Sequence, residues 1–340
     1  MTIKQNKRMA RKKRKGKGKI VLLILTVFIL STVISAYTFL DKMKSVKISK
    51  ADEDLGISNK EDKVIKDDKP NPKDDVINIA LFGGDKRGKY DPVHSDAIMI
   101  LSIDKANNTI KLSSIMRDTY VNVYKHGMTK ITHAYGYGGP ELAIRTLNEN
   151  FNLNIRDYAF VDFFGFKDII DSLDGIDVEV KKYEVNEINK YIREVANIEG
   201  KSPTLIKKSG FQHLNGAQAL SYSRIRKVGN GDFERTDRQR KVMELLFERV
   251  MNAGITQYPK MVDSILPHVE TSLSKMDVVK LGTQILSSDI KGIEQNCFPL
   301  AENCIGKKID GIFYIVSDLS ETEDEIHKFI YGDIEQCNLN

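Results

Sequence analysis

The stretch "AIMILSIDKANNTIKLSSI", residues 97–115, contains two apolar runs separated by a short polar segment. Both runs, 97–104 and 109–115, are rich in β-branched and other apolar residues, a composition typical of β-strands. Apolar side chains fall on both faces of these strands, as expected where helices cover a sheet on both sides. The stretch therefore predicts two covered sheet strands.

Further strands and helices are predicted on either side of this stretch. The strands are predicted at 76–82, 119–124, 158–163 and 176–180, and near 293–300 and 309–315. The helices are predicted at 139–151, 234–254, 274–287 and 318–331. Because strands come first and elements of both kinds follow in mixed order, we expect an α/β fold: an α-β-α sandwich around a mixed, partly antiparallel central sheet.

The amino-terminal 40 residues have a different composition from the rest of the chain. Residues 1–19 contain ten lysines and arginines and no acidic residue, so the formal net charge of +5 leaves −5 for the remainder. Residues 20–40 carry no charge, and a helix of that length rises about 31 Å, close to the hydrocarbon thickness of a bilayer. We expect one N-terminal transmembrane helix at the cell membrane, with the basic tail in the cytoplasm and the C-terminal domain outside the cell.

Two other interpretations of this region are weaker. A cleaved signal peptide normally has an apolar region of only about 7 to 15 residues, followed by a cleavage site of small residues. The basic tail also resembles a nucleic-acid-binding patch, but it is fully explained as a topology signal, so no nucleic-acid partner is expected.

Residues 41–75 are rich in lysine and aspartate and poor in large apolar groups. Such a segment buries too little apolar surface to offset its ordering entropy, so we predict a solvated extracellular linker. Residues 76–340 are expected to form one extracellular catalytic domain. Three cysteines fall in this domain, Cys297, Cys304 and Cys337, and the odd number leaves the pairing of Cys297 with Cys304 open.

The segment "LFGGDKRGKY", residues 81–90, resembles a nucleotide-binding P-loop at first sight. A P-loop needs serine or threonine after its lysine and a helix that starts there. Tyr90 takes that position, and Pro92 follows closely, which argues against a helix starting at Lys89. The match is a coincidence of composition.

Two carboxylates near this segment have a different potential role. Asp85 comes at the end of one predicted strand and Asp96 at the start of the next. If the two strands are neighbours, both carboxylates meet at one edge of the sheet, where their oxygens suit Mg²⁺. A turn-forming Asp85 and a capping Asp96 are the plainer alternative.

Arginines gather near the ends of predicted elements. Arg117 follows a strand, and Arg224 and Arg226 are two residues apart, a spacing that in extended chain directs both side chains the same way. Arg235, Arg238 and Gln239 share one face of the predicted helix 234–254. Converging guanidinium groups bind phosphate oxygens through paired hydrogen bonds, although each arginine alone is more often a surface ion-pair partner.

Seven ordered blocks of sequence resemble the LytR–CpsA–Psr family. They are "INIALFGGDKR", "HSDAIMILSID", "LSSIMRDTYVNV", "KITHAYGYGGPELAIRTLNENF", "VDFFGFKDIIDSLDGIDVEV", "HLNGAQALSYSRIRK" and "GDFERTDRQRKV". The resemblance runs from about Val76 to Gly254, and the basic tail and single span match as well. It implies a membrane-anchored phosphotransferase of Gram-positive cell walls, which moves a glycopolymer such as teichoic acid or capsule from undecaprenyl pyrophosphate to a muramic-acid hydroxyl of peptidoglycan.

The resemblance also implies roles for individual residues. Asp85 and Asp96 correspond to aspartates linked to Mg²⁺, and either is a candidate general base; Arg117 is the third implied catalytic residue. The implied pyrophosphate-binding residues are Arg117, Arg224, Arg226, Arg235, Gln218, Gln239 and Asp232. Cations placed where charge develops on a pyrophosphate leaving group lower the barrier to its departure. The polyprenyl chain needs an apolar slot, and the apolar segment 158–166 and the helix at 139–151 are the candidates to line it.

The chain departs from the family pattern at two positions. Met116 stands where proline usually precedes the Arg-Asp pair, and His94 stands where arginine is frequent. A mostly neutral histidine there weakens one phosphate contact, unless Lys86, Arg87 or Lys89 substitutes. Nothing in the sequence marks the other histidines as ligands.

Two alternatives to the transferase stay open at this point. One is a noncatalytic regulator or adaptor of wall assembly that binds polyprenyl phosphate, and the other is a lipid-pyrophosphate hydrolase that uses water as the acceptor. The pair of carboxylates favours catalysis, because a pure anion-binding site gains nothing from negative charge beside pyrophosphate unless a metal intervenes.

Overall fold

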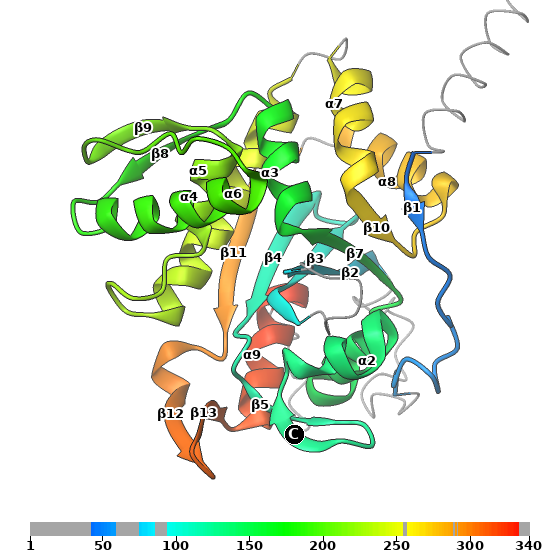
Figure 1. Cartoon of the computed structure of the whole chain (residues 1–340). Helices are drawn as coiled ribbons and strands as arrows, with labels where there is room; N and C mark the ends of the chain where they lie inside the picture. Colours follow the sequence, from blue (N-terminus) through cyan, green and yellow to red (C-terminus); the bar gives the residue numbers. More distant parts are fainter. Residues whose placement is uncertain are drawn as a thin grey trace, which may run out of the picture. The chain divides into compact units, whose positions relative to one another are not determined.

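A seven-stranded sheet forms the centre of the unit that spans Lys44–Asn340 (Figure 1). The computed structural model describes residues 42–58, 75–85, 94–253, 257–287, 290 and 292–332. In spatial order the strands are β1 (Lys44–Ser45), β10 (Val269–Thr271), β7 (Asp157–Asp162), β2 (Val76–Gly84), β3 (Ser95–Asp104), β4 (Thr109–Ile115) and β11 (Ile293–Phe298).

The sheet is mixed, as predicted. β2, β3 and β4 pair antiparallel in sequence order, whereas β7 runs parallel to β2 and β11 runs parallel to β4. The strands predicted at 119–124 and 176–180 also exist, but they belong to two-stranded sheets outside the central one. These small sheets are β5 (Tyr120–Val123) with β6 (Gly127–Lys130), β8 (Ile176–Val180) with β9 (Gly210–Leu214), and β12 (Cys304–Ile309) with β13 (Ile312–Ser317).

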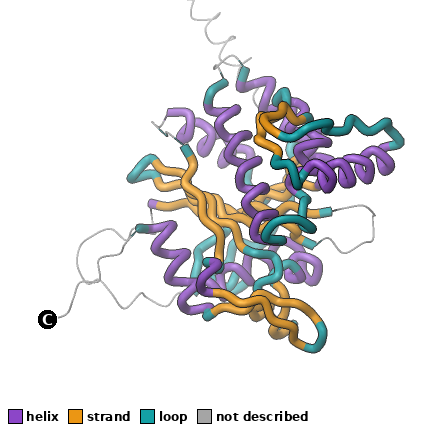
Figure 2. The backbone as a smooth tube through the Cα atoms, turned by 90° about the vertical axis from the view of Figure 1, so that its left-hand side faces the viewer, coloured by secondary structure: helices purple, strands orange, loops and turns teal. Residues whose placement is uncertain are grey.

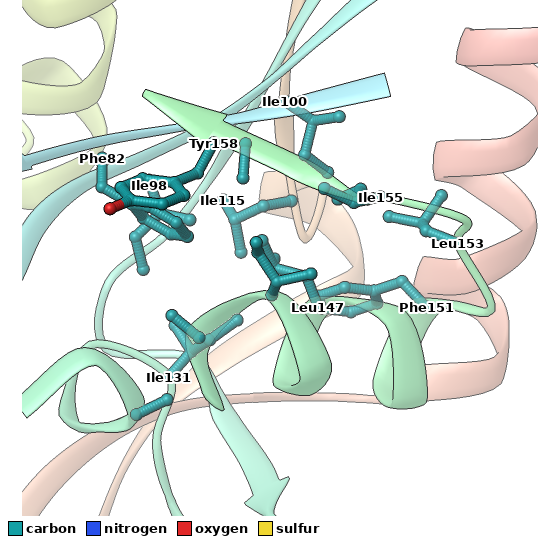
Figure 3. Close-up of a cluster of buried hydrophobic side chains, with 14 of the residues drawn as sticks. Phe82, Ile98, Ile100, Ile115, Ile131, Leu147, Phe151, Leu153, Ile155 and Tyr158 are labelled. Carbon is teal, nitrogen blue, oxygen red and sulfur yellow. The ribbon is translucent and has the colours of Figure 1, made fainter. Parts of the chain in front are cut away.

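Helices α2 (His133–Phe151) and α9 (Leu319–Tyr331) cover one face of the sheet. Phe82, Ile98 and Ile100 of the central strands belong to the same buried cluster as Leu147 and Phe151 of α2 (Figure 3). Alternate residues of a strand point to opposite faces, so this cluster uses only one half of each central strand. Its burial fixes the register of β2 against β3.

A second group of helices packs on the other face, so helices lie on both sides of the central strands (Figure 2). The core of this layer includes Ile170 of α3, Tyr222 of α5, and Val242 and Leu246 of α6. Val242 and Leu246 lie on the helix predicted at 234–254. The helices of this layer are α3 (Phe163–Ser172), α4 (Val185–Glu199), α5 (Gly216–Ser223), α6 (Asp232–Met251) and α7 (Tyr258–Ile265). Elsewhere in the chain are α8 (Lys275–Ser287) and the 3-10 turns η2 (Leu266–His268) and η3 (Ala301–Asn303).

The folded unit begins earlier than the sequence predicts. Part of the segment expected to be linker, 41–75, packs on the domain: β1 pairs with β10, and Leu55 is fully buried in the core beside α2. Asn148 Nδ2 donates to the Leu55 carbonyl at 2.8 Å, and Lys50 forms an ion pair with Asp157. The prediction of a solvated linker is wrong for residues 44–57, because its low average hydrophobicity conceals one well-placed leucine.

We expect Leu55→Ala to lower the free energy of unfolding by about 2–4 kcal/mol, because it removes a fully buried side chain and leaves a cavity. The measurement is urea unfolding of the full chain in detergent, followed by circular dichroism. Val46→Ala is the matched control: Val46 lies on the same segment but is 36% exposed, so its truncation should change the free energy of unfolding by less than about 0.5 kcal/mol. Equal, small effects of both variants would show that this segment is not part of the core.

Several predictions fall outside the described residues. They are the basic tail 1–19, the transmembrane helix 20–40, most of the second half of the predicted linker, the basic residues Lys86, Arg87 and Lys89, and Cys337. Among the helices that the structure describes, none combines the length and the apolar character that crossing a membrane requires.

Cys297 and Cys304 are both free thiols, and burial raises the pKa of Cys297 to about 11, so that thiol stays protonated at neutral pH.

Candidate functional site

The site lies at the edge of the sheet where β2 ends and β3 begins. Gly84 pairs with Ser95 and Gly83 pairs with Ala97, so Asp96 is the extra residue of a β-bulge. A bulge redirects a side chain and is frequent beside functional sites. β2 and β3 pair with each other, so the two strands are neighbours, as predicted. Asp85 follows Gly84 directly, and both aspartates therefore lie at the same edge of the sheet.

Arg117 and Asp118, at the end of β4, contribute the next two charges. Arg117 forms an ion pair with the Asp96 carboxylate, and its Nε lies 3.7 Å from Asp118 Oδ1. Asp118 is almost fully buried, with Lys130 Nζ 2.8 Å from Oδ1. Burial alone would raise the pKa of Asp118, but the Lys130 ammonium and the Arg117 and Arg226 guanidinium groups outweigh it and hold that pKa below its usual range. Asp118 is therefore ionised and anchors the arginines, a role that sequence reasoning missed although the residue directly follows Arg117.

Arg235 reaches the same edge from the first turns of α6. Its Nη2 donates to the Asp96 carbonyl at 2.9 Å and lies 3.9 Å from Asp96 Oδ1, and its Nη1 lies 3.5 Å from Asp232 Oδ1. Burial, together with the positive charge of Arg117, lowers the pKa of Arg235 to about 10. The guanidinium stays protonated at neutral pH, so it presents a poorly solvated positive charge that a bound anion can neutralise.

Arg224 and Arg226 have different partners, contrary to the prediction that both point the same way. Arg224 ends α5 in helical rather than extended conformation, so the alternation expected of extended chain does not apply. Arg226 Nε lies 3.0 Å from Asp232 Oδ1, and Arg226 Nη2 lies 4.0 Å from Asp118 Oδ2. Arg226 therefore belongs to the carboxylate cluster.

Arg224 instead lies among aromatic rings. Its guanidinium carbon is 5.0 Å from the centroid of the Phe163 ring and 4.9 Å from that of Tyr191, and its Nη2 donates to Glu194 Oε1 at 3.1 Å. A guanidinium between rings gains cation–π energy while keeping hydrogen-bond donors for an anion.

The two glutamines named in the sequence also differ. Gln239 lines the recess formed by Asp96, Arg117, Asp118, Asp232 and Arg235. Gln218 instead completes the capping box at the start of α5: its Oε1 accepts from the Asn215 N–H at 3.0 Å, and its Nε2 donates to the Thr204 carbonyl at 3.0 Å. With both ends of its amide engaged there, Gln218 holds α5 in place and does not join the charged recess.

An apolar cavity of about 150 Å³ lies beside this recess and shares Asp96, Arg235 and Gln239 with it. Its walls come from the central strands β2, β3 and β7 and from the helices α3, α5 and α6. The lining residues are Leu81, Phe82, Gly83, Ala97, Met99, Ala159, Val161, Phe163, Phe166, Leu220, Ser223, Arg224 and Met243. Segment 158–166 thus lines the cavity, whereas helix 139–151, the other candidate slot, packs on the opposite face of the sheet.

The positions that depart from the family pattern have clear environments. Met116 is buried, and its N–H donates to the Phe298 carbonyl at 2.9 Å, a hydrogen bond that proline could not make. His94 is exposed, and its ring centroid lies 5.4 Å from that of His133. Among the described residues, no group of three or more histidine, cysteine, aspartate or glutamate side chains is placed to hold a metal ion.

A buried network supports the segment that carries Arg224 and Arg226. Arg238 is 4% exposed; its Nε donates to Glu184 Oε1 at 2.8 Å and its Nη1 donates to the carbonyl of Ile225, the residue between the two arginines, at 3.1 Å. Glu184 Oε2 in turn accepts from the Lys181 N–H at 2.7 Å. Arg238 therefore positions the arginine segment and, unlike Arg235, does not reach the recess.

We expect Arg238→Met to lower the free energy of unfolding by about 3 kcal/mol, because it leaves the buried Glu184 carboxylate without its partner. Adding Glu184→Gln should recover much of that loss, since the uncompensated charge is then removed. Urea unfolding of both single variants and the double variant measures their coupling, which we expect to exceed about 1 kcal/mol. Additive effects of the two substitutions would contradict the pairing.

Comparison with known proteins finds one family that covers most of the chain. Its sequence matches the LytR_cpsA_psr family over residues 39–328. Polyisoprenyl-teichoic acid–peptidoglycan teichoic acid transferase TagU of Oceanobacillus iheyensis is 34% identical over 271 residues, covering 77% of this chain and 77% of that protein. Regulatory protein MsrR of Staphylococcus aureus is 33% identical over 226 residues, covering 66% of this chain and 63% of that protein.

Solved structures agree with the sequence match. The structure of TagT bound to LI-WTA superposes with a TM-score of 0.62 at 25% identity, covering 84% of this chain and 99% of that one. The crystal structure of B. subtilis TagV superposes with a TM-score of 0.59 at 27% identity, covering 75% of this chain and 97% of that one. The fold, the ordered sequence blocks and these matches together show that the chain belongs to the LytR–CpsA–Psr family.

Proposed function

We propose that this protein transfers an anionic glycopolymer, of the teichoic acid or capsule type, from undecaprenyl pyrophosphate to a hydroxyl group of peptidoglycan. One observation carries the proposal: the charged recess and the apolar cavity share Asp96, Arg235 and Gln239. A lipid diphosphate has the same two parts, an apolar chain joined to a concentrated negative charge. TagU, the relative described above, is named for such a transfer, and TagT has been solved bound to LI-WTA.

In this proposal the guanidinium groups hold the diphosphate. Arg117 and Arg235 flank Asp96, and Arg224 reaches from the wall of the apolar cavity, so together they supply paired donors to phosphate oxygens. The acceptor oxygen attacks the phosphorus that carries the glycan, the bond from that phosphorus to the bridging oxygen breaks, and polyprenyl phosphate leaves. The arginines stabilise the charge that grows on the departing phosphate.

A proton must leave the acceptor hydroxyl during this step. Asp85 or Asp96 is the proposed general base, because both lie at the sheet edge where the recess opens. Asp96 Oδ1 is ion-paired with Arg117, so its other carboxylate oxygen is the candidate acceptor of the proton.

The donor set also suits Mg²⁺, which proteins usually hold through one or two carboxylates together with substrate phosphates. Asp85 and Asp96, on neighbouring strand ends, are the residues that would hold it. When bound, the ion would neutralise charge on the diphosphate. We place the active site outside the cell, with the chain anchored by the predicted helix 20–40 and the basic tail 1–19 in the cytoplasm.

A noncatalytic regulator is the second candidate function, since the relative MsrR is named a regulatory protein. Both functions need the arginines, so only turnover separates them. The test incubates the full chain in detergent with a lipid-diphosphate glycan, peptidoglycan fragments and Mg²⁺. Glycan joined to the fragments supports the transferase, release of phosphorylated glycan without transfer supports a hydrolase, and tight lipid binding without turnover supports the regulator.

A further inference from the structure

Four rings form a row on the surface that begins beside the charged recess. The ring centroids of His94 and His133 are 5.4 Å apart, those of His133 and Tyr137 are 5.8 Å apart, and those of Tyr137 and His126 are 4.3 Å apart. The last pair is stacked, with an angle of 15° between the ring planes. Tyr137 is 48% exposed, so part of its ring is open to a ligand.

Three separate segments build this ring row, and local interactions hold it in place. His126 comes from the turn between β5 and β6, His133 and Tyr137 come from the start of α2, and His94 precedes β3. Thr129 Oγ1 lies 2.9 Å from His133 Nδ1. Gly138 and Gly139 depart from helical backbone angles, so the first turn of α2, which carries the rings, is set apart from the part of the helix that packs in the core.

The ring row is continuous with the proposed catalytic edge. His94 lies two residues before Asp96, and Lys130, at the end of β6, forms the ion pair with Asp118. The row belongs to the side of the sheet that α2 covers, whereas the apolar cavity lies on the side of α3, α5 and α6. Asp96, at the start of β3, lies between the ring row and the apolar cavity.

The geometry of in-line phosphoryl transfer indicates from which side of the site the acceptor approaches. The attacking oxygen and the leaving oxygen lie on opposite sides of the phosphorus. If the polyprenyl phosphate leaves toward the apolar cavity, the acceptor must approach from the side of the ring row. This inference therefore rests on the proposed function, and it concerns how the acceptor is held.

The chemistry of the ring row fits a sugar better than a lipid. Tyrosine and histidine offer apolar ring faces together with polar edges, so they can cover the flat face of a pyranose and hydrogen-bond to its hydroxyls. Burial and the nearby charges of His94, Lys130 and Arg117 lower the pKa of His133, so its ring is neutral at pH 7 and keeps one acceptor nitrogen.

We infer that His94, His133, Tyr137 and His126 form a subsite for the glycan strand of the acceptor, with pyranose rings resting on Tyr137 and His126. The experiment measures transfer by the full chain in detergent, with uncrosslinked peptidoglycan oligosaccharide as acceptor and a lipid-diphosphate glycan as donor. Its variants are Tyr137→Ala, Tyr137→Phe and His126→Ala. Phe211→Ala is the control, because Phe211 is 75% exposed on β9 and contacts none of these rings.

We expect Tyr137→Ala to raise the KM for the acceptor about tenfold, which corresponds to about 1.4 kcal/mol, and to leave kcat and the KM for the donor within about twofold. His126→Ala should have a smaller effect in the same direction, and Tyr137→Phe should raise the acceptor KM less than Tyr137→Ala does, because the ring face stays and only the hydroxyl is lost. Phe211→Ala should resemble the unmodified chain. An unchanged acceptor KM in both alanine variants would overturn the inference. A rise in the donor KM instead would also overturn it, since the rings would then hold the donor glycan.

A failure of the proposed function would be recognised separately. If the unmodified chain transfers no glycan, binding of the same oligosaccharide is measured by isothermal titration calorimetry. Binding that Tyr137→Ala weakens about tenfold would support the subsite although the transfer is absent, and no binding to the unmodified chain would overturn it.

Discussion

Asp96→Asn is expected to lower the rate of transfer about 1,000-fold while leaving the fold intact. The amide keeps the shape of the carboxylate, but it can neither accept the proton of the acceptor hydroxyl nor help to hold a cation. A general base and a group that stabilises developing charge each contribute about 100-fold or more. Asp96 is partly exposed in its pair with Arg117, so the stability change should stay within about 1 kcal/mol.

In the absence of added Mg²⁺, the same substitution should leave binding of the lipid diphosphate unchanged or stronger. Asp96 carries negative charge beside the proposed position of the phosphates, and its neutralisation leaves Arg117 and Arg235 available to the ligand. Single-turnover transfer and equilibrium binding of a polyprenyl diphosphate are the two measurements. Asp177→Asn is the control, since Asp177 pairs with His213 on the β8–β9 sheet. Near-normal transfer by Asp96→Asn would remove Asp96 from the catalytic step.

Arg235→Gln is expected to lower kcat/KM between 100- and 1,000-fold, the loss typical of removing one group that stabilises developing charge. Arg235 is 7% exposed and its guanidinium lies beside both Asp96 and Asp232, so its charge acts where water screens it poorly. Unlike Asp96→Asn, this substitution should also weaken binding of the lipid diphosphate by at least tenfold.

Arg235→Lys tests whether geometry matters beyond charge. Lysine keeps the positive charge but lacks the planar fork that reaches the Asp96 carbonyl and a phosphate together, so we expect only partial recovery. Arg249→Gln on the other end of α6 is the control, because Arg249 pairs with the exposed Asp174. Full activity of Arg235→Gln with unchanged binding would contradict the proposed clamp. The lowered pKa of Arg235, about 10, is still far above neutral pH, so its contribution should be constant through neutral pH.

The strands of the sheet could be predicted from the sequence because each is a short, continuous apolar run. β2, β3, β4 and β7 match the predicted ranges closely. The sequence did not show which strands would pair, and β5 and β8 lie outside the central sheet. They are short and are followed by partners that complete separate two-stranded sheets. Pairing depends on contacts distant in sequence, which local composition does not encode.

The amino-terminal segment was misjudged for a related reason. Residues 44–57 look polar on average, and only a view of the folded chain shows that Leu55 enters the core and that β1 extends the sheet through β10. A single buried leucine does not stand out in a window dominated by lysine and aspartate.

The charged residues of the site were predicted better than their contacts. Asp96, Arg117, Asp232, Arg235 and Gln239 meet at one recess. Spacing predicted one shared direction for Arg224 and Arg226, but Arg224 ends a helix and has other partners. The amide of Gln218 is engaged in the capping box of that helix. Asp118 and Lys130 were missed because their importance comes from burial beside other charges, which residue type does not reveal. Arg238 was grouped with Arg235 and Gln239, but it binds the buried Glu184 instead of reaching the recess. The ring row was missed because its members come from three segments.

The most direct test of the central claim is a crystal structure of the chain with a bound polyprenyl diphosphate. The account predicts phosphate oxygens within hydrogen-bonding distance of Arg117, Arg224 and Arg235, and the polyprenyl chain along the cavity lined by Phe163, Phe166 and Met243. A diphosphate bound away from Asp96, or a polyprenyl chain lying on the side of the sheet that α2 covers, would contradict it.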